Sequence, residues 1–188
     1  MSKAIASARD SAKVGLHVRP RIIEAPELIA KYSVKHYNRL TGEVYSHEEF
    51  ENLIVNAGLT YLVGSALLST TAITTWYLGL TAASPTIAAA DTMGSHAGWT
   101  EFTTYSEAVR QTATLVAGAA GAAGNSASPA TFSINGSGTI GGVFLTSNNT
   151  KSGTTGTLFS AKALPGGNRA VVDTDAVDVT WSIAVTSS

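Results

Sequence analysis

The stretch Val177–Val185 (VDVTWSIAV) decides the fold class of this chain. Its branched and aromatic residues occupy every second position, with small or polar residues between them: Val177, Val179, Trp181, Ile183 and Val185. A period of two is typical of a β-strand that buries one face. The end of the sequence therefore predicts a long, half-buried strand.

Shorter strand patterns precede this one, at Trp76–Leu80, Thr131–Ile134 and Val143–Leu145, and turn-forming residues separate them. Several short strands, one early helix and no βαβ rhythm predict a mainly β protein, an antiparallel jelly-roll-like sandwich over residues 31–188. The alanine- and glycine-rich segment Ala117–Ser128 is interpreted as a flexible loop between strands.

The start of this body predicts a hairpin followed by the helix. Tyr32–Tyr37 alternates in polarity, Thr41-Gly42 supplies a turn, and Val44-Tyr45 returns. The next residues, Ser46–Glu49, fit a capping box, in which Ser46 accepts from the N3 amide and Glu49 reaches back. Apolar residues then follow at helical spacing from Phe50. These signals predict a helix near residues 47–68.

Residues 1–30 predict an extended N-terminal arm. Val14, Leu16 and Val18 alternate with polar residues, and Pro20 and Pro26 then favour extended backbone. Two interpretations stay open: a disordered tail, or an arm that orders on a partner. The second is favoured because the apolar pairs at 22–23 and 28–29 would otherwise face solvent. The first ten residues lack the apolar core of a signal peptide, so none is expected.

Charge is scarce and unevenly placed. The chain of 188 residues has 12 Lys and Arg, 13 Asp and Glu and no cysteine, for a net charge of −1. Residues 1–51 hold 15 of these charges, whereas the windows 52–90 and 111–150 hold none. The absence of cysteine excludes disulfides and thiolate chemistry, and the charge balance argues against general nucleic-acid binding. A neutral, hydroxyl-rich surface suits packing against other protein.

Segments that resemble functional motifs are interpreted as structural. The GxGxxG match at 136–141 runs on into a strand, so it predicts a hairpin turn rather than a dinucleotide site. Asp173, Asp175 and Asp178 lack the further ligands of an EF-hand and predict an acidic turn. Leu53–Ile73 contains too many polar residues for a membrane span. Structural or surface roles are expected for each of the isolated histidines, His17, His36, His47 and His96.

No pattern of residues predicts catalysis, a metal or a cofactor, and the chain is not expected to be an enzyme. No GxSxG elbow occurs, and the carboxylates of the body form no supported pair. Arg110 lies between two windows without charge, close to Glu101 and Glu107. An arginine in an apolar, hydroxyl-rich sheet needs a partner, so an ion pair with one of these acids is predicted.

The order of several motifs resembles virion structural proteins of tailed bacteriophages, in particular small capsid cement (decoration) proteins with a jelly-roll-like body. The resemblance covers roughly residues 35–185 and rests on five stretches: Asn52–Leu59 (NLIVNAGL), Trp76–Leu80 (WYLGL), Asp91–Glu101 (DTMGSHAGWTE), Tyr105–Ala108 (YSEA) and Gly138–Leu145 (GTIGGVFL). It implies a protein on the outer surface of the capsid that trimerises and bridges subunits of the major capsid protein.

With this resemblance, the arm becomes the expected capsid-binding segment, without a role for nucleic acid or membrane. Its expected contact residues are Val14, Leu16, Val18, Arg19, Arg21, Ile22, Ile23, Leu28 and Ile29. Four aromatic residues of the body are assigned to the core or to self-association: Trp76, Trp99, Tyr105 and Trp181.

Two alternatives stay open beside the cement role. One is another virion component, such as a head-fibre base or a tail-associated protein. The other is an enzyme or carbohydrate-binding module on a sandwich fold, whose exposed Trp76, Trp99 and Tyr105 would line a sugar platform.

Overall fold

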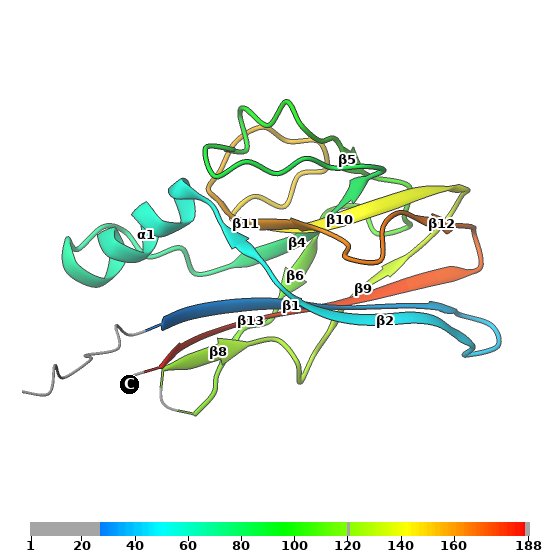
Figure 1. Ribbon diagram of the computed structural model, residues 1–188, viewed down its shortest axis with the longest axis horizontal. Coiled ribbons are helices and arrows are strands. Elements are labelled where there is room, and N and C mark those ends of the chain that lie inside the picture. The colour runs from blue at the N-terminus through cyan, green and yellow to red at the C-terminus, as the bar shows by residue number, and fades with distance from the viewer. Residues whose placement is uncertain (1–26, 120, 187–188) are drawn as a thin grey trace, which may run out of the picture.

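The computed structural model describes residues 27–119 and 121–186. These residues form two antiparallel β-sheets stacked as a sandwich, with one helix at one end (Figure 1). The mainly β sandwich with one helix near its N-terminus, predicted from the strand patterns, is confirmed.

The first sheet has six strands and is organised around β13 (Asp175–Thr186). β1 (Glu27–Asn38) pairs with β13 along its whole length, from Glu27 opposite Thr186 to Asn38 opposite Asp175. β2 (Val44–Glu51) pairs with the outer side of β1. On the other side of β13 lie β8 (Ala122–Gly124) and β9 (Ala130–Ser133), and β7 (Val116–Ala117) pairs with β8.

The second sheet has seven strands and is organised around β10 (Gly138–Thr146). Its path runs β3 (Leu53–Ile54), β11 (Leu158–Ala163), β10, β4 (Trp76–Ala82) and β5 (Glu101–Phe102). Two short strands lie off this path, β12 (Arg169–Val171) beside β10 and β6 (Gln111–Ala113) beside β4.

The main core lies between the sheets because alternate residues of each strand turn inward. On β1 the inward row is Ala30, Tyr32, Val34 and His36, each of them buried. The Tyr32 hydroxyl donates across the sandwich to the Ser160 carbonyl oxygen at 3.1 Å and lies 2.8 Å from the Ser160 hydroxyl. Burial raises the pKa of Tyr32 far above its usual value, so this group stays a protonated donor.

A second apolar cluster covers the outer face of the second sheet. Phe144 of β10 and Leu158 of β11 are buried there against Met93 and Trp99, which come from the long connection between β4 and β5. Figure 1 shows this connection and the loop between β10 and β11 arching over the sheet. The sheet is therefore buried on both faces, which explains its continuous apolar runs.

The helix is shorter than predicted. Residues 44–51 form β2 rather than a helical start, and α1 spans Asn56–Leu67 with Val55 at its N-cap and no side-chain cap. The predicted capping box is therefore wrong. Pairing with β1 overrides the helical spacing, because it places Phe50 beside Tyr32, with ring centroids 6.1 Å apart, and buries that contact.

The predicted hairpin at the start of the body is confirmed. Asn38 closes its turn, since its side-chain oxygen accepts from the amides of Leu40 and Thr41 at 2.8 and 3.1 Å. Gly42 adopts a φ of 75°, which favours glycine. β1, however, already includes Leu28 and Ile29, which pair with Val185 and Ala184. Residues 27–30, which the sequence analysis assigns to the arm, therefore belong to β1 of the body.

Two other predictions are corrected. Ala117–Ser128 contains the last residue of β7 and the whole of β8 rather than only a flexible loop, because the edge of β13 accepts Ala122–Gly124 as a pairing strand. The GxGxxG match at 136–141 is not a hairpin turn, because its last four residues already belong to β10, and β9 before it lies in the other sheet. That segment carries the chain from one layer of the sandwich to the other.

Gly79 is needed because the aromatic ring of Phe144 lies directly over it. The two residues face each other across β4 and β10, and a methyl group on Gly79 would overlap the ring. We expect Gly79→Ala to lower the free energy of unfolding by about 1–3 kcal/mol, the usual cost of overpacking. Urea titration followed by tryptophan fluorescence measures this change in the free energy of unfolding.

Gly94→Ala is the matched control, since the nearest atom to an added methyl group there is 3.4 Å away, an ordinary contact. Equal stability of the two variants would contradict the packing described for Phe144.

Candidate functional site

The four aromatic residues assigned to the core or to self-association all lie in the interior. Trp76, Trp99, Tyr105 and Trp181 are each less than a tenth exposed. Phe159 joins two of them, with ring centroids 5.2 Å from Trp76 and 5.3 Å from Trp181, both edge to face. All four are therefore buried within the body, and a surface for self-association has to come from other residues.

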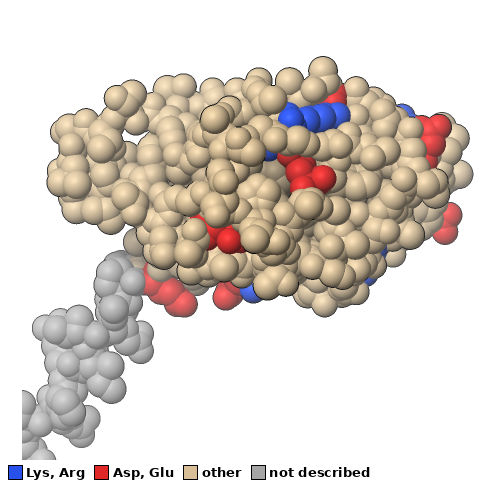
Figure 2. All heavy atoms as spheres, turned by 90° about the horizontal axis from the view of Figure 1, so that it is seen from above, with Lys and Arg blue, Asp and Glu red and all other residues tan. Residues whose placement is uncertain are grey.

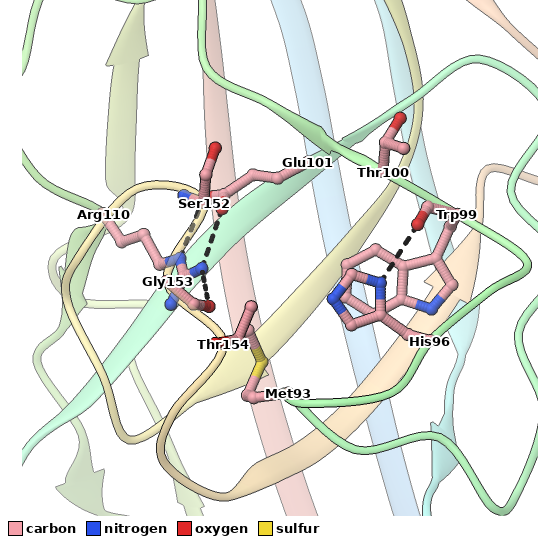
Figure 3. Close-up of a pocket in the computed structure, with 9 residues that line it drawn as sticks. All are labelled: Met93, His96, Trp99, Thr100, Glu101, Arg110, Ser152, Gly153 and Thr154. Carbon is pink, nitrogen blue, oxygen red and sulfur yellow. Dashed lines mark hydrogen bonds and ion pairs between the residues drawn. The ribbon is translucent and has the colours of Figure 1, made fainter.

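A cavity of about 230 Å³ opens where the β4–β5 connection meets the β10–β11 loop. In Figure 3 an ion pair lies on one side of it and two stacked rings lie on the other. Its lining residues are Met93, His96, Trp99, Thr100, Glu101, Arg110, Ser152, Gly153 and Thr154.

The ion pair is formed by Arg110 and Glu101, as the sequence predicts. Arg110 Nε and Nη2 donate to the two Glu101 carboxylate oxygens at 2.9 and 2.7 Å, and both side chains are almost fully buried. The remaining donors of Arg110 bind the carbonyl oxygens of Asn148 and Gly153. Glu101 also accepts from the Ser152 amide at 2.6 Å. The pair thus fastens the β10–β11 loop to the sheet.

The stacked rings on the other side of the cavity belong to His96 and Trp99. Their centroids are 3.9 Å apart, and the Trp99 ring also contacts Phe144, with ring centroids 5.1 Å apart. Trp99 Nε1 donates to Asp91 Oδ2 at 3.0 Å. Because Trp99 is only 6% exposed, it offers no platform on which a sugar ring could stack.

Glu107 and Lys151 have separate structural roles near this cavity. Glu107 accepts from the Ser133 amide, so it is not the partner of Arg110. Lys151 Nζ donates to the carbonyl oxygens of Thr103 and Tyr105 and lies 3.6 Å from the centre of the Tyr105 ring. Desolvation lowers the pKa of Lys151. These contacts hold the β5–β6 connection in place.

The acidic residues near β13 also make structural contacts. Asp175 is buried and lies 2.9 Å from Nε2 of the buried His36. Asp178 accepts from the hydroxyls of Thr131 and Tyr37. In residues 27–119 and 121–186, no three His, Asp or Glu side chains gather closely enough to hold a metal ion.

The most unusual surface of the described residues is the outward face of α1. Leu59, Val63 and Leu67 are exposed at spacings of four residues, and we call these three residues the apolar stripe. Figure 2 shows no charged side chain over this end of the molecule on the face it presents. The stripe is not among the site residues predicted from the sequence, although the sequence carries its signals: apolar residues at helical spacing within a window that has no charge.

The arm residues are only partly described. Leu28 and Ile29 belong to β1, whereas Val14, Leu16, Val18, Arg19, Arg21, Ile22 and Ile23 lie outside the described residues, as does His17. β1 begins at the same end of the molecule as α1 and the end of β13 (Figure 1). The arm is therefore attached at the end that carries the apolar stripe.

Comparison with known proteins finds no family whose model matches the chain and no curated protein with significant similarity to it. Among residues 27–119 and 121–186, no helix is long and apolar enough to cross a membrane.

The buried ion pair supplies the next prediction. Glu101→Gln leaves the Arg110 guanidinium buried without its counter-charge, so we expect a loss of about 3–5 kcal/mol in the free energy of unfolding. Glu49→Gln is the control, because Glu49 pairs with Lys31 at 3.7 Å on the exposed surface and its loss costs at most about 1 kcal/mol. Urea titration compares the two, and a similar small loss in both would contradict the structural role of Arg110.

Proposed function

We propose that this chain is a capsid cement (decoration) protein of a tailed bacteriophage. In this role it binds subunits of the major capsid protein on the outer surface of the head and bridges them. The motif resemblance suggests this class of protein, and the observation that carries the proposal is the attachment of the arm. β1 brings residues 1–26 to the end of the body that carries the exposed stripe of α1.

The arm and the body offer the shell two contact regions, which favours binding by several weak contacts at once. The arm of 26 residues has a contour length of at most about 90 Å, enough to reach beyond the subunit under the body. Once one region is bound, the other binds as an intramolecular event at high effective concentration. A rigid sandwich with an attached arm can therefore bridge neighbouring subunits without an active site.

The apolar residues of the arm should contribute more than its charges. Ile22 and Ile23 gain about 25 cal/mol for each Å² of apolar surface that they bury. Arg19 and Arg21 can form surface ion pairs, each of which contributes about 0–1 kcal/mol.

The two alternatives differ in their support. A sugar platform of Trp76, Trp99 and Tyr105 would need exposed rings, and all three are buried. A head-fibre base or tail-associated protein would use the same arm and body, so its location on the particle is what separates it from a cement protein.

The capsid role predicts that a variant lacking residues 1–26 no longer co-sediments with phage heads that lack this protein. β1 stays intact in this variant, so its circular dichroism and unfolding midpoint should match those of the full chain. Ile22→Ser/Ile23→Ser should weaken binding more than Arg19→Ser/Arg21→Ser does.

Unchanged head binding after the deletion would contradict the proposal. Electron microscopy of particles carrying labelled protein provides the second test. Label confined to the tail or to the vertices would replace the cement role with one of the other virion roles.

A further inference from the structure

The outward face of α1 has the opposite composition from that of an ordinary surface helix. Its exposed positions are Asn56, Leu59, Thr60, Val63, Ala66 and Leu67, without a charge among them. Val63 is 54% exposed and Leu67 76%. Surface helices normally place charged and polar residues on the face away from the core. An uncharged face with three large apolar residues is typical of a helix that packs against another protein surface.

The helix is firmly attached to the body, so the exposure of the stripe is a fixed feature. Gly58 lies against the backbone of Phe159, where a side chain would not fit. The Tyr61 hydroxyl accepts from the Ile73 amide at 2.9 Å, and the Tyr61 ring lies edge to face with Trp76 at 5.2 Å. These contacts orient α1 and point the stripe away from the core.

From this arrangement we propose that the apolar stripe is a two-fold contact between two copies of this chain. Residues at intervals of four form a ridge on a helix surface, and two such ridges interdigitate when helices cross at about −50°. Leu59, Val63 and Leu67 form one ridge of this kind. A two-fold axis brings the same ridge from a second copy, so the surface is complementary to itself.

Charge also favours a second copy as the occupant. In a two-fold contact, residues near the axis meet their own images, and like charges there would repel each other. Residues 52–90 contain no charged residue, so α1 and its flanks avoid this repulsion. A different partner would gain specificity from complementary charges, and this surface provides none.

The contact should be weak and insensitive to salt. One 12-residue helix covers much less than the roughly 800 Å² that each partner contributes to a stable interface. We therefore expect a reversible dimer with a dissociation constant in the micromolar range or above. Because the contact has no ion pairs, this constant should change by less than about twofold between low and high salt. The inference does not rest on the capsid role, and for the chain in solution it replaces the trimer that the resemblance implies with a dimer.

Sedimentation equilibrium of the full chain over a wide concentration range tests the proposal. The wild type should show a monomer–dimer equilibrium. Val63→Asp places a carboxylate opposite its own image and should weaken the dimer by about 100-fold or more. Val109→Asp is the matched control, because Val109 is 42% exposed and lies outside α1, and this variant should dimerise like the wild type. Circular dichroism checks that each variant is folded.

Charge complementation tests the two-fold geometry. Val63→Lys alone should also be monomeric, whereas an equal mixture of Val63→Asp and Val63→Lys should form heterodimers. A monomeric wild type at all concentrations, a trimer, or a dimer that survives Val63→Asp would overturn the proposal. If Val63→Asp abolishes head binding while the wild type is monomeric in solution, the stripe binds the shell instead. Head binding by the variant lacking residues 1–26 reports separately on the capsid role.

Discussion

The antiparallel pairing of β1 with β13 is the constraint on which the rest of the structure depends. It joins the first and last described strands along their whole length, from Glu27 opposite Thr186 to Asn38 opposite Asp175. The outer edge of β1 then receives β2, and the far edge of β13 receives β8 and β9. The inward row of β1 reaches the second sheet through the Tyr32–Ser160 hydrogen bonds. The same pairing fixes where the arm leaves the body.

Local sequence patterns predicted the elements whose periodicity fits only one type of secondary structure. The alternation over Val177–Val185 identified β13, and the turn at Thr41-Gly42 identified the first hairpin. The start of the helix could not be predicted locally, since the spacing after Ser46 suits a helix as well as a strand, and only pairing with β1 decides between them. β8 was missed because alanine and glycine have low β-propensity, and its strand conformation comes from the free edge of β13.

Some side-chain contacts were likewise predictable from the sequence, whereas others depend on the tertiary fold. An ion pair of Arg110 with Glu101 or Glu107 was predictable because so few charges occur in that part of the chain, and the structure shows that Glu101 is the partner. That Trp99 is buried against His96 and Phe144 depends on a loop folding over the second sheet, which no local pattern specifies. The stripe on α1 could not be separated from a core-facing row until the structure showed that Gly58 faces the body.

The uneven charge distribution in the sequence corresponds to two different surfaces of the folded protein, the outer face of the first sheet and the exposed face of α1. The outer face of the first sheet carries ion pairs between Lys31 and Glu49 and between Lys35 and Asp178. α1 and its flanks, within residues 52–90, carry no charge. β2 is an edge strand of the first sheet, and an exposed edge invites uncontrolled strand addition. Its exposed Glu49 and Glu51 oppose such addition. The charges thus oppose pairing of the sheet edge with other chains, which leaves the uncharged face of α1 as the surface where association costs the least desolvation.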